Sequence, residues 1–135
     1  LMAALSLGAH GVWMGTRFIA TEEARAHDNY KAKIVEINED GTTVTRAHSG
    51  KNARMARNKF TDSWVGREAE IKAYPYQLRE VGEPASVRGR LEGDTEQGVV
   101  PMGQGSGTIH SVQPAGDVVT DIISEARTVF DGWRI

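Results

Sequence analysis

A short apolar stretch at residues 11–14, Gly-Val-Trp-Met, most constrains what this chain can fold into. Residues 1–7 before it are mainly Leu, Met and Ala, which are strong helix formers, and Gly8 stands where helices often end on a glycine. A short apolar segment after a helix and a tight turn is typical of a buried parallel strand. The start of the chain therefore predicts a helix followed by a strand, as in an α/β fold.

The predicted strand ends on Gly15 and Thr16, and this turn is the first candidate site. Glycine lets backbone N–H groups approach an anion with no Cβ in the way, and the threonine hydroxyl adds a further donor. The same pattern also suits a plain turn without a ligand. The residues of the turn leave both interpretations open.

The middle of the chain shows several further elements. Thr21 is a candidate N-cap for a helix over residues 22–37, and a turn at residues 40–41 leads to a β-branched strand over residues 42–45. The composition of residues 52–59 predicts another helix. Residues 62–100 contain two prolines and several glycines, which predict loops with one or two short helices.

A second glycine-rich segment follows at residues 104–107 and carries an amide at Gln104 and a hydroxyl at Ser106. Together with Gly105 these residues suit the lining of a ligand site, and they equally suit a flexible connection to the last helix. His110, shortly after, is the histidine best placed for an acid–base role.

A final helix is expected to begin near Pro114 and to end at Gly132. Its apolar residues recur at helical spacing and predict a wide buried stripe, made of Val118, Val119, Ile122, Ile123, Ala126, Val129 and Phe130.

Composition and net charge exclude several classes of function for this chain. Of the 135 residues 39% are hydrophobic and 25% charged, as in ordinary globular domains, and a formal net charge of -2 gives no field to gather nucleic acid. No apolar run approaches the roughly 18 residues of a membrane span, and the absence of cysteine excludes disulfides and thiolate metal sites. We expect a soluble cytoplasmic protein with no nucleic-acid or membrane partner.

Three blocks carry a family resemblance. The first is Leu-Ser-Leu-Gly-Ala-His-Gly-Val-Trp-Met-Gly-Thr-Arg-Phe at residues 5–18 with Thr-Glu-Glu at 21–23, the second lies within residues 43–58 and includes Ser-Gly-Lys-Asn-Ala-Arg, and the third is Met-Gly-Gln-Gly-Ser-Gly at 102–107. In this order they resemble nitronate monooxygenases, formerly called 2-nitropropane dioxygenases. The order in which the blocks occur makes the match far more specific than any one block.

The resemblance implies an FMN-binding TIM-type (β/α)8 barrel whose flavin phosphate lies between the loops after strands seven and eight, as barrels generally place phosphate. It implies that residues 1–20 end the barrel with a helix, strand eight and the phosphate turn, that residues 21–112 form a post-barrel segment of helices and loops, and that residues 113–135 form a C-terminal helix. Because a whole barrel takes about 250 residues and the chain begins at Leu1, we expect it to be the C-terminal part of a longer protein.

The resemblance also implies the site and the reaction. The cofactor-binding residues expected on this chain are Met14, Gly15, Thr16, Gln104, Gly105 and Ser106. The implied reaction is the oxidation of alkyl nitronates with O2, and the catalytic histidine of the family is expected upstream of Leu1, so the chain alone should be inactive. A related FMN-dependent enoyl-acyl carrier protein reductase and a non-catalytic remnant of a barrel are the alternatives.

Overall fold

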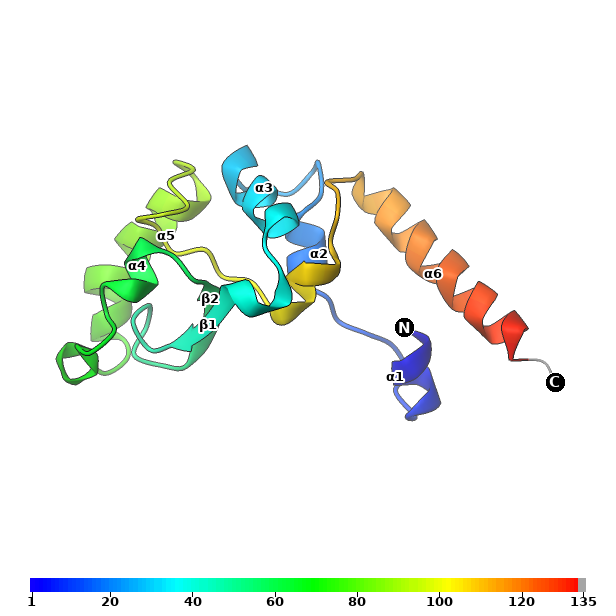
Figure 1. Cartoon of the computed structure of the whole chain (residues 1–135), viewed down its shortest axis with the longest axis horizontal. Coiled ribbons are helices and arrows are strands. Elements are labelled where there is room, and N and C mark those ends of the chain that lie inside the picture. The colour runs from blue at the N-terminus through cyan, green and yellow to red at the C-terminus, as the bar shows by residue number, and fades with distance from the viewer. Residues whose placement is uncertain (134–135) are drawn as a thin grey trace.

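The computed structural model describes residues 1–133, which combine helices with one two-stranded antiparallel β-sheet (Figure 1). The α-helices are α1 (Met2–Ser6), α2 (Thr16–Ile19), α3 (Asp28–Glu36), α4 (Lys59–Asp62), α5 (Glu83–Arg90) and α6 (Ala115–Gly132). The strands are β1 (Thr42–Thr45) and β2 (Ala53–Ala56). Shorter helical turns are η1 (Glu39–Gly41), η2 (Glu68–Glu70), η3 (Leu78–Gly82, a π-helical turn) and η4 (Gln104–Thr108).

The two strands form an antiparallel hairpin in which Thr42 lies opposite Ala56 and Thr45 opposite Ala53. The prediction of a strand over residues 42–45 is confirmed. The prediction of a helix over residues 52–59 is wrong, because residues 53–56 form β2. Alanine, arginine and methionine favour helices, but the backbone N–H of Ala56 donates to the carbonyl of Val100, and tertiary pairing overrides the weak local preference.

The core consists of two apolar clusters, and β2 contributes to both. Neighbouring residues of a strand point to opposite faces. Met55 accordingly belongs to one cluster and Ala56 to the other, and both are fully buried. The cluster around Met55 also contains Ala47, Phe60, Ala85 and Val99. The cluster around Ala56 contains Ala20, Tyr30, Ile34, Val100, Met102 and Ile109, and it supports the candidate site described below.

The predicted strand at residues 11–14 is not formed in the described part of the chain. These residues run without regular hydrogen bonding from α1 to α2, and Trp13 is 99% exposed. A parallel strand needs a neighbouring strand to receive its hydrogen bonds, and residues 1–133 place none beside this segment. The helix before it is confirmed as α1, and Gly8 adopts the positive φ of 90° expected after a helix end.

Helix α3 begins later than predicted, at Asp28, and its N-cap is His27. The ring nitrogen Nδ1 of His27 accepts a hydrogen bond of 3.1 Å from the backbone N–H of Asn29. Thr21 does not cap this helix, because its side chain is buried and its hydroxyl donates to the carbonyl of Phe18 at 2.8 Å. Sequence reasoning missed the cap because histidine is not among the common capping residues.

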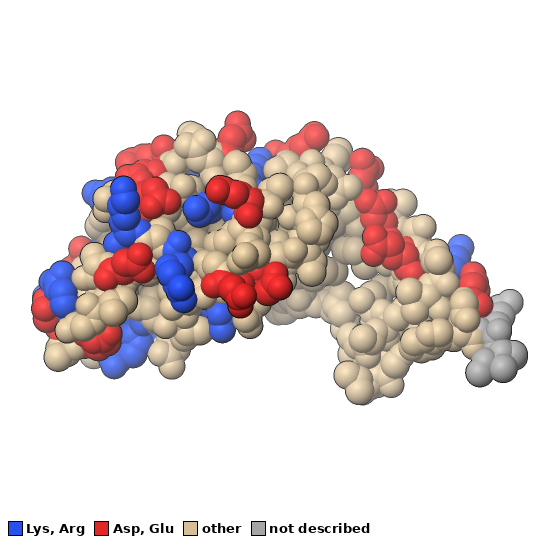
Figure 2. Space-filling view, in the orientation of Figure 1, with Lys and Arg blue, Asp and Glu red and all other residues tan. Residues whose placement is uncertain are grey.

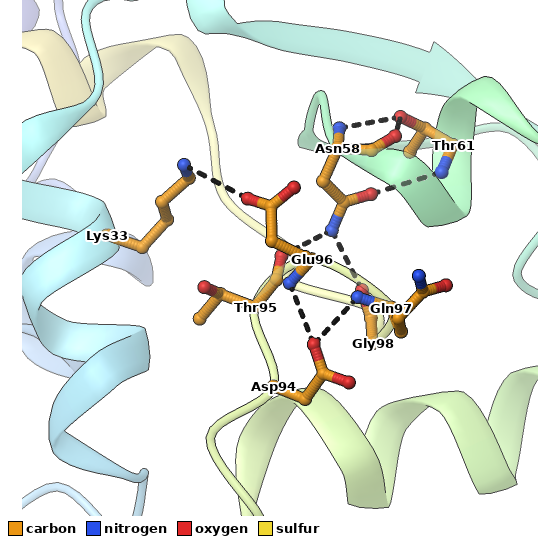
Figure 3. Close-up of polar contacts among 8 residues, drawn as sticks. All are labelled: Lys33, Asn58, Thr61, Asp94, Thr95, Glu96, Gln97 and Gly98. Carbon is orange, nitrogen blue, oxygen red and sulfur yellow. Dashed lines mark hydrogen bonds and ion pairs between the residues drawn. The ribbon is translucent and has the colours of Figure 1, made fainter.

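Asn58 connects two segments of the middle region (Figure 3). Its side-chain oxygen accepts from the N–H of Thr61 at 3.1 Å and forms a capping box at the start of α4. Its amide nitrogen donates to the carbonyls of Thr95 at 2.6 Å and Gly98 at 2.9 Å. The prediction of loops with short helices over residues 62–100 is confirmed by α5, η2 and η3.

Helix α6 has the predicted bounds, with Pro114 as N-cap and Gly132 as its last residue. The prediction of a wide buried stripe is wrong for the described chain. Val118 is 2% exposed, whereas Ile123 and Phe130 are each 53% exposed. The short helix α1 lies beside α6 (Figure 1), and Figure 2 shows acidic side chains along one edge of α6. The apolar residues of α6 that remain exposed are Val119, Ile123, Val129 and Phe130. Within residues 1–133 no helix is long and apolar enough to cross a membrane.

Candidate functional site

The predicted phosphate turn lies where the irregular segment after α1 meets α2. Gly15 is the N-cap of α2, so the first backbone N–H groups of this helix have no acceptor within the helix. A Cβ placed on Gly15 would meet no atom within 4 Å. The turn therefore presents backbone donors beside open space, which is the arrangement that an anion requires.

The structure brings this turn to the glycine-rich segment 104–107. The hydroxyl oxygen of Thr16 accepts a hydrogen bond of 3.0 Å from the backbone N–H of Gly103. A threonine hydroxyl can accept one hydrogen bond and still donate its own proton. The two parts of the site predicted from separate sequence motifs are therefore joined directly, and Thr16 keeps a donor for a ligand.

The glycine-rich segment is an ordered helical turn, η4, and not a flexible connection. Ser106 is fully buried, and its hydroxyl donates to the carbonyl of Gly103 at 2.9 Å. Met102 and Ile109, on either side of the turn, are both anchored in the apolar cluster around Ala56. A Cβ on Gly107 would lie 2.8 Å from the backbone nitrogen of Glu39, so glycine is needed there for η4 to pack against η1.

A cavity of about 650 Å³ opens between the turn, the end of η4 and one side of α6. Four of the six predicted cofactor-binding residues line this cavity. Met14, Gly15 and Thr16 line it at the turn, and Gly105 lines it from η4. Gln104 is exposed and does not line the cavity, and the side chain of Ser106 is turned to its own loop. His110 lines the cavity as an exposed residue.

Arg17 is a residue of this site to which sequence reasoning gave no role. It lines the cavity, and one of its terminal nitrogens donates to the carbonyls of Ala20 at 2.9 Å and Ser111 at 3.0 Å. Its Nε is buried with no hydrogen-bond partner among the described residues. Burial lowers the pKa of Arg17 and the charge of Asp121 opposes this shift, but a guanidinium stays protonated. The signal was present in the sequence, as the arginine after Gly-Thr in the first family block.

The cavity is electrically asymmetric. Arg17 lines it from α2, next to the turn, whereas Asp121 and Glu125 line it from α6. An anion would therefore be favoured beside the turn and disfavoured beside α6. The charge distribution agrees with the position of the backbone donors at Gly15.

The remaining histidines lie away from this cavity. His10 is exposed, and His27 caps α3. The Nε2 of His48 is 3.1 Å from the hydroxyl of Ser86, and burial lowers the pKa of His48.

Residues 1–125 match the family described as nitronate monooxygenase. A probable nitronate monooxygenase of Staphylococcus aureus strain MSSA476 is 31% identical over 129 residues, which cover 96% of this chain and 36% of that protein. The chain thus spans about a third of the length of the curated relatives that it matches.

Two solved structures are also similar. FabK from Thermotoga maritima is 36% identical, with a TM-score of 0.83 over 98% of this chain and 42% of that one. Nitroalkane oxidase from Streptomyces ansochromogenes is 27% identical, with a TM-score of 0.76 over 96% of this chain and 37% of that one.

Proposed function

We propose that this chain, which belongs to the nitronate monooxygenase family, supplies part of the cofactor site of an FMN-dependent oxidoreductase that oxidises alkyl nitronates with O2. The observation that carries the proposal is the hydrogen bond between Thr16 and Gly103, which joins two family motifs at the edge of an open cavity. The similarity to a nitroalkane oxidase supports the same reaction class.

The residues beside the cavity suit the phosphate end of FMN. Backbone N–H groups at Gly15 and Thr16 would donate to the phosphate, with the Thr16 hydroxyl as a further donor. Arg17 would add positive charge on the same side of the cavity. The flavin supplies the redox chemistry, and the share of this chain is to bind and orient it.

Within the glycine-rich turn, the proposed contacts have different roles. Gly105 lines the cavity, and the absence of a Cβ there leaves room for a ligand, since a Cβ would meet no atom within 4 Å. Ser106 would act through Gly103, whose carbonyl it holds. Gln104, exposed next to the cavity, is proposed to lie at its mouth.

We further propose that residues 1–20 complete a (β/α)8 barrel, with residues 21–112 as a post-barrel segment and residues 113–133 as a terminal helical segment. Residues 134–135, which the sequence assigned to the same helix, lie outside the described residues. Two features support this arrangement. Residues 11–14 have no strand partner within residues 1–133, and apolar residues of α6 are exposed there. In a complete barrel, a neighbouring strand would pair with residues 11–14, and neighbouring helices would cover the apolar residues of α6.

A second candidate is an FMN-dependent enoyl-acyl carrier protein reductase, because the first family block resembles that group as well. A non-catalytic remnant is the third. The complete protein should be purified and its bound flavin identified. O2 consumption with alkyl nitronates would support the proposed function, nicotinamide oxidation with an enoyl thioester would support the second candidate, and absence of bound flavin would contradict both.

A further inference from the structure

A groove between α5 and residues 24–27 contains two adjacent cavities that nothing above assigns. They measure about 490 and 370 Å³ and share three lining residues, Arg25, Ser86 and Arg90. We name this region the arginine groove. Both volumes lie within the range of about 300 to 1,000 Å³ that is common for small-molecule sites.

Hydrogen bonds between α3 and α5 fix the shape of the groove. The backbone N–H of His27 donates to the carbonyl of Arg90 at 2.8 Å, and the amide of Asn29 donates to the carbonyl of Gly93 at 2.9 Å. The Nε of Arg90 donates to the carbonyl of Arg25 at 3.2 Å. The end of α5 is thereby tied to the start of α3, and the guanidinium of Arg90 is held beside the groove, which the side chain of Arg25 also lines.

The two arginines carry charge that the described chain does not neutralise. The ion pairs within residues 1–133 involve other residues, and neither Arg25 nor Arg90 takes part in one. Glu83, which also lines the outer cavity, lies about two turns of α5 away from Arg90. Two guanidinium groups that line the same cavities without an ion-pair partner favour an anionic ligand, which arginine binds through charge-assisted hydrogen bonds.

Arg90 also acts on the interior of the groove. Burial raises the pKa of the Tyr30 hydroxyl, and the positive charge of Arg90 opposes this rise. Tyr30 and His48 both line the inner cavity, where the hydroxyl of Ser86 lies 3.1 Å from the Nε2 of His48. Burial lowers the pKa of His48, which favours its neutral form. The hydrogen-bonded groups of His48 and Ser86 therefore add neutral polar atoms to the inner cavity and no acidic group.

Beyond these polar groups, the cavities are apolar. Ile19, Ala24 and Ala26, all partly exposed, line the inner cavity, and Val87 and Leu91 line the outer one. A ligand that fills the groove therefore meets positive charge where the cavities join and an apolar wall further in. An anionic head on an alkyl chain matches both surfaces.

We propose that the arginine groove binds an amphipathic anion, with a carboxylate or phosphate head between Arg25 and Arg90 and a short alkyl chain in the inner cavity. None of the residues that line the groove lines the cavity at Gly15 and Thr16. The proposal therefore does not depend on the assignment of FMN, and either can fail without the other.

The test is a calorimetric titration of the complete flavin-loaded protein with octanoate, octyl phosphate and 1-octanol. We expect both anions to bind and the alcohol to bind at least about tenfold more weakly, and the tighter anion identifies the preferred head. Arg25→Gln and Arg90→Gln should each weaken the anions by about tenfold or more. Arg88→Gln is the matched control, because Arg88 is exposed on the same helix and lines neither cavity.

Arg25 is exposed and its side chain makes no hydrogen bond with the described residues, so Arg25→Gln should fold normally. Butanoate should bind more weakly than octanoate, because a shorter chain buries less apolar surface. The proposal is overturned by a wild-type protein that binds neither anion at millimolar concentration, by octanol binding as tightly as octanoate, or by equal affinities in Arg25→Gln and Arg88→Gln.

Discussion

The hydroxyl oxygen of Thr16 accepts a 3.0 Å hydrogen bond from the backbone N–H of Gly103, which lies 87 residues further along the chain. This contact fixes the glycine-rich turn against the start of α2 and makes the two predicted parts of the cofactor site one structural unit. The side chain of Thr16 therefore has two roles: it holds the backbone of Gly103, and it is a proposed hydrogen-bond donor to the phosphate. Substitutions at this position must be designed to separate the two roles.

Ser106 should contribute to stability more than Gln104. Ser106 is fully buried and its hydroxyl donates to the carbonyl of Gly103, which also accepts from the backbone N–H of Ser106. Ser106→Ala removes one of these two donors and should cost about 0.5 to 1.5 kcal/mol. Gln104→Ala is the matched control, since Gln104 is exposed in the same turn. Urea denaturation of the complete protein measures both, and equal midpoints for the two variants would contradict the buried role of Ser106.

Replacing Asn58 should destabilise the middle region strongly. Asn58→Ala removes the cap of α4 and the donor to Thr95 and Gly98, and these losses together should cost about 2 to 4 kcal/mol (Figure 3). Asn52→Ala changes an exposed asparagine at the nearby hairpin and should cost little. Chemical denaturation compares the variants, and a loss below about 0.5 kcal/mol in Asn58→Ala would show that the network is not needed.

Acidification should weaken the fold through His48. Burial lowers the pKa of this side chain below the value near 6.5 of an unfolded chain. As the pH falls below about 6.5, the unfolded state therefore binds the proton first and the free energy of unfolding decreases, whereas above that pH the contribution is constant.

The measurement for His48 is denaturation at several values between pH 7.5 and 5 in wild type and in His48→Gln. The variant should lose less stability on acidification. His10→Gln changes an exposed histidine and serves as the control. An identical pH dependence in His48→Gln and wild type would assign the acid sensitivity to other groups.

Local patterns predicted the elements whose stability is local. The strand at residues 42–45 consists of β-branched residues, and the last helix is bounded by Pro114 and Gly132, so both had their observed limits. The family motifs selected Gly15, Thr16 and Gly105, and the structure places all three around one cavity. Local composition and turn chemistry predicted the strand and the helix, whereas the choice of the three site residues came from the family resemblance.

The elements that were missed depend on distant partners. Residues 53–56 have helical composition, but pairing with β1 and a hydrogen bond to Val100 make them a strand. Residues 11–14 have strand composition, but no neighbouring strand exists within residues 1–133. The contacts of Thr16 with Gly103 and of Arg17 with Ser111 form only when α2 meets residues 103–111, and no short pattern encodes these contacts.

A side chain at Gly15 should disturb the ligand and not the fold. A Cβ there meets no atom of the described chain, and its φ of -97° suits any residue, so Gly15→Ala should unfold like wild type. In the complete protein the same change should weaken FMN retention by at least about tenfold, because the methyl group would stand between the backbone donors and the phosphate. Gly116→Ala, at another position with open space, should retain FMN, and full retention by Gly15→Ala would place the phosphate elsewhere.

The most direct test of the proposed cofactor site is a titration of FMN and riboflavin against wild type, Thr16→Ser and Thr16→Val in the complete protein. Thr16→Ser keeps the hydroxyl and should behave like wild type. Thr16→Val removes a donor to a charged group, so FMN should bind about tenfold to a hundredfold more weakly. Riboflavin has no phosphate and should lose much less. Equal losses for FMN and riboflavin in Thr16→Val would show that Thr16 only holds Gly103 and that the turn does not bind the phosphate.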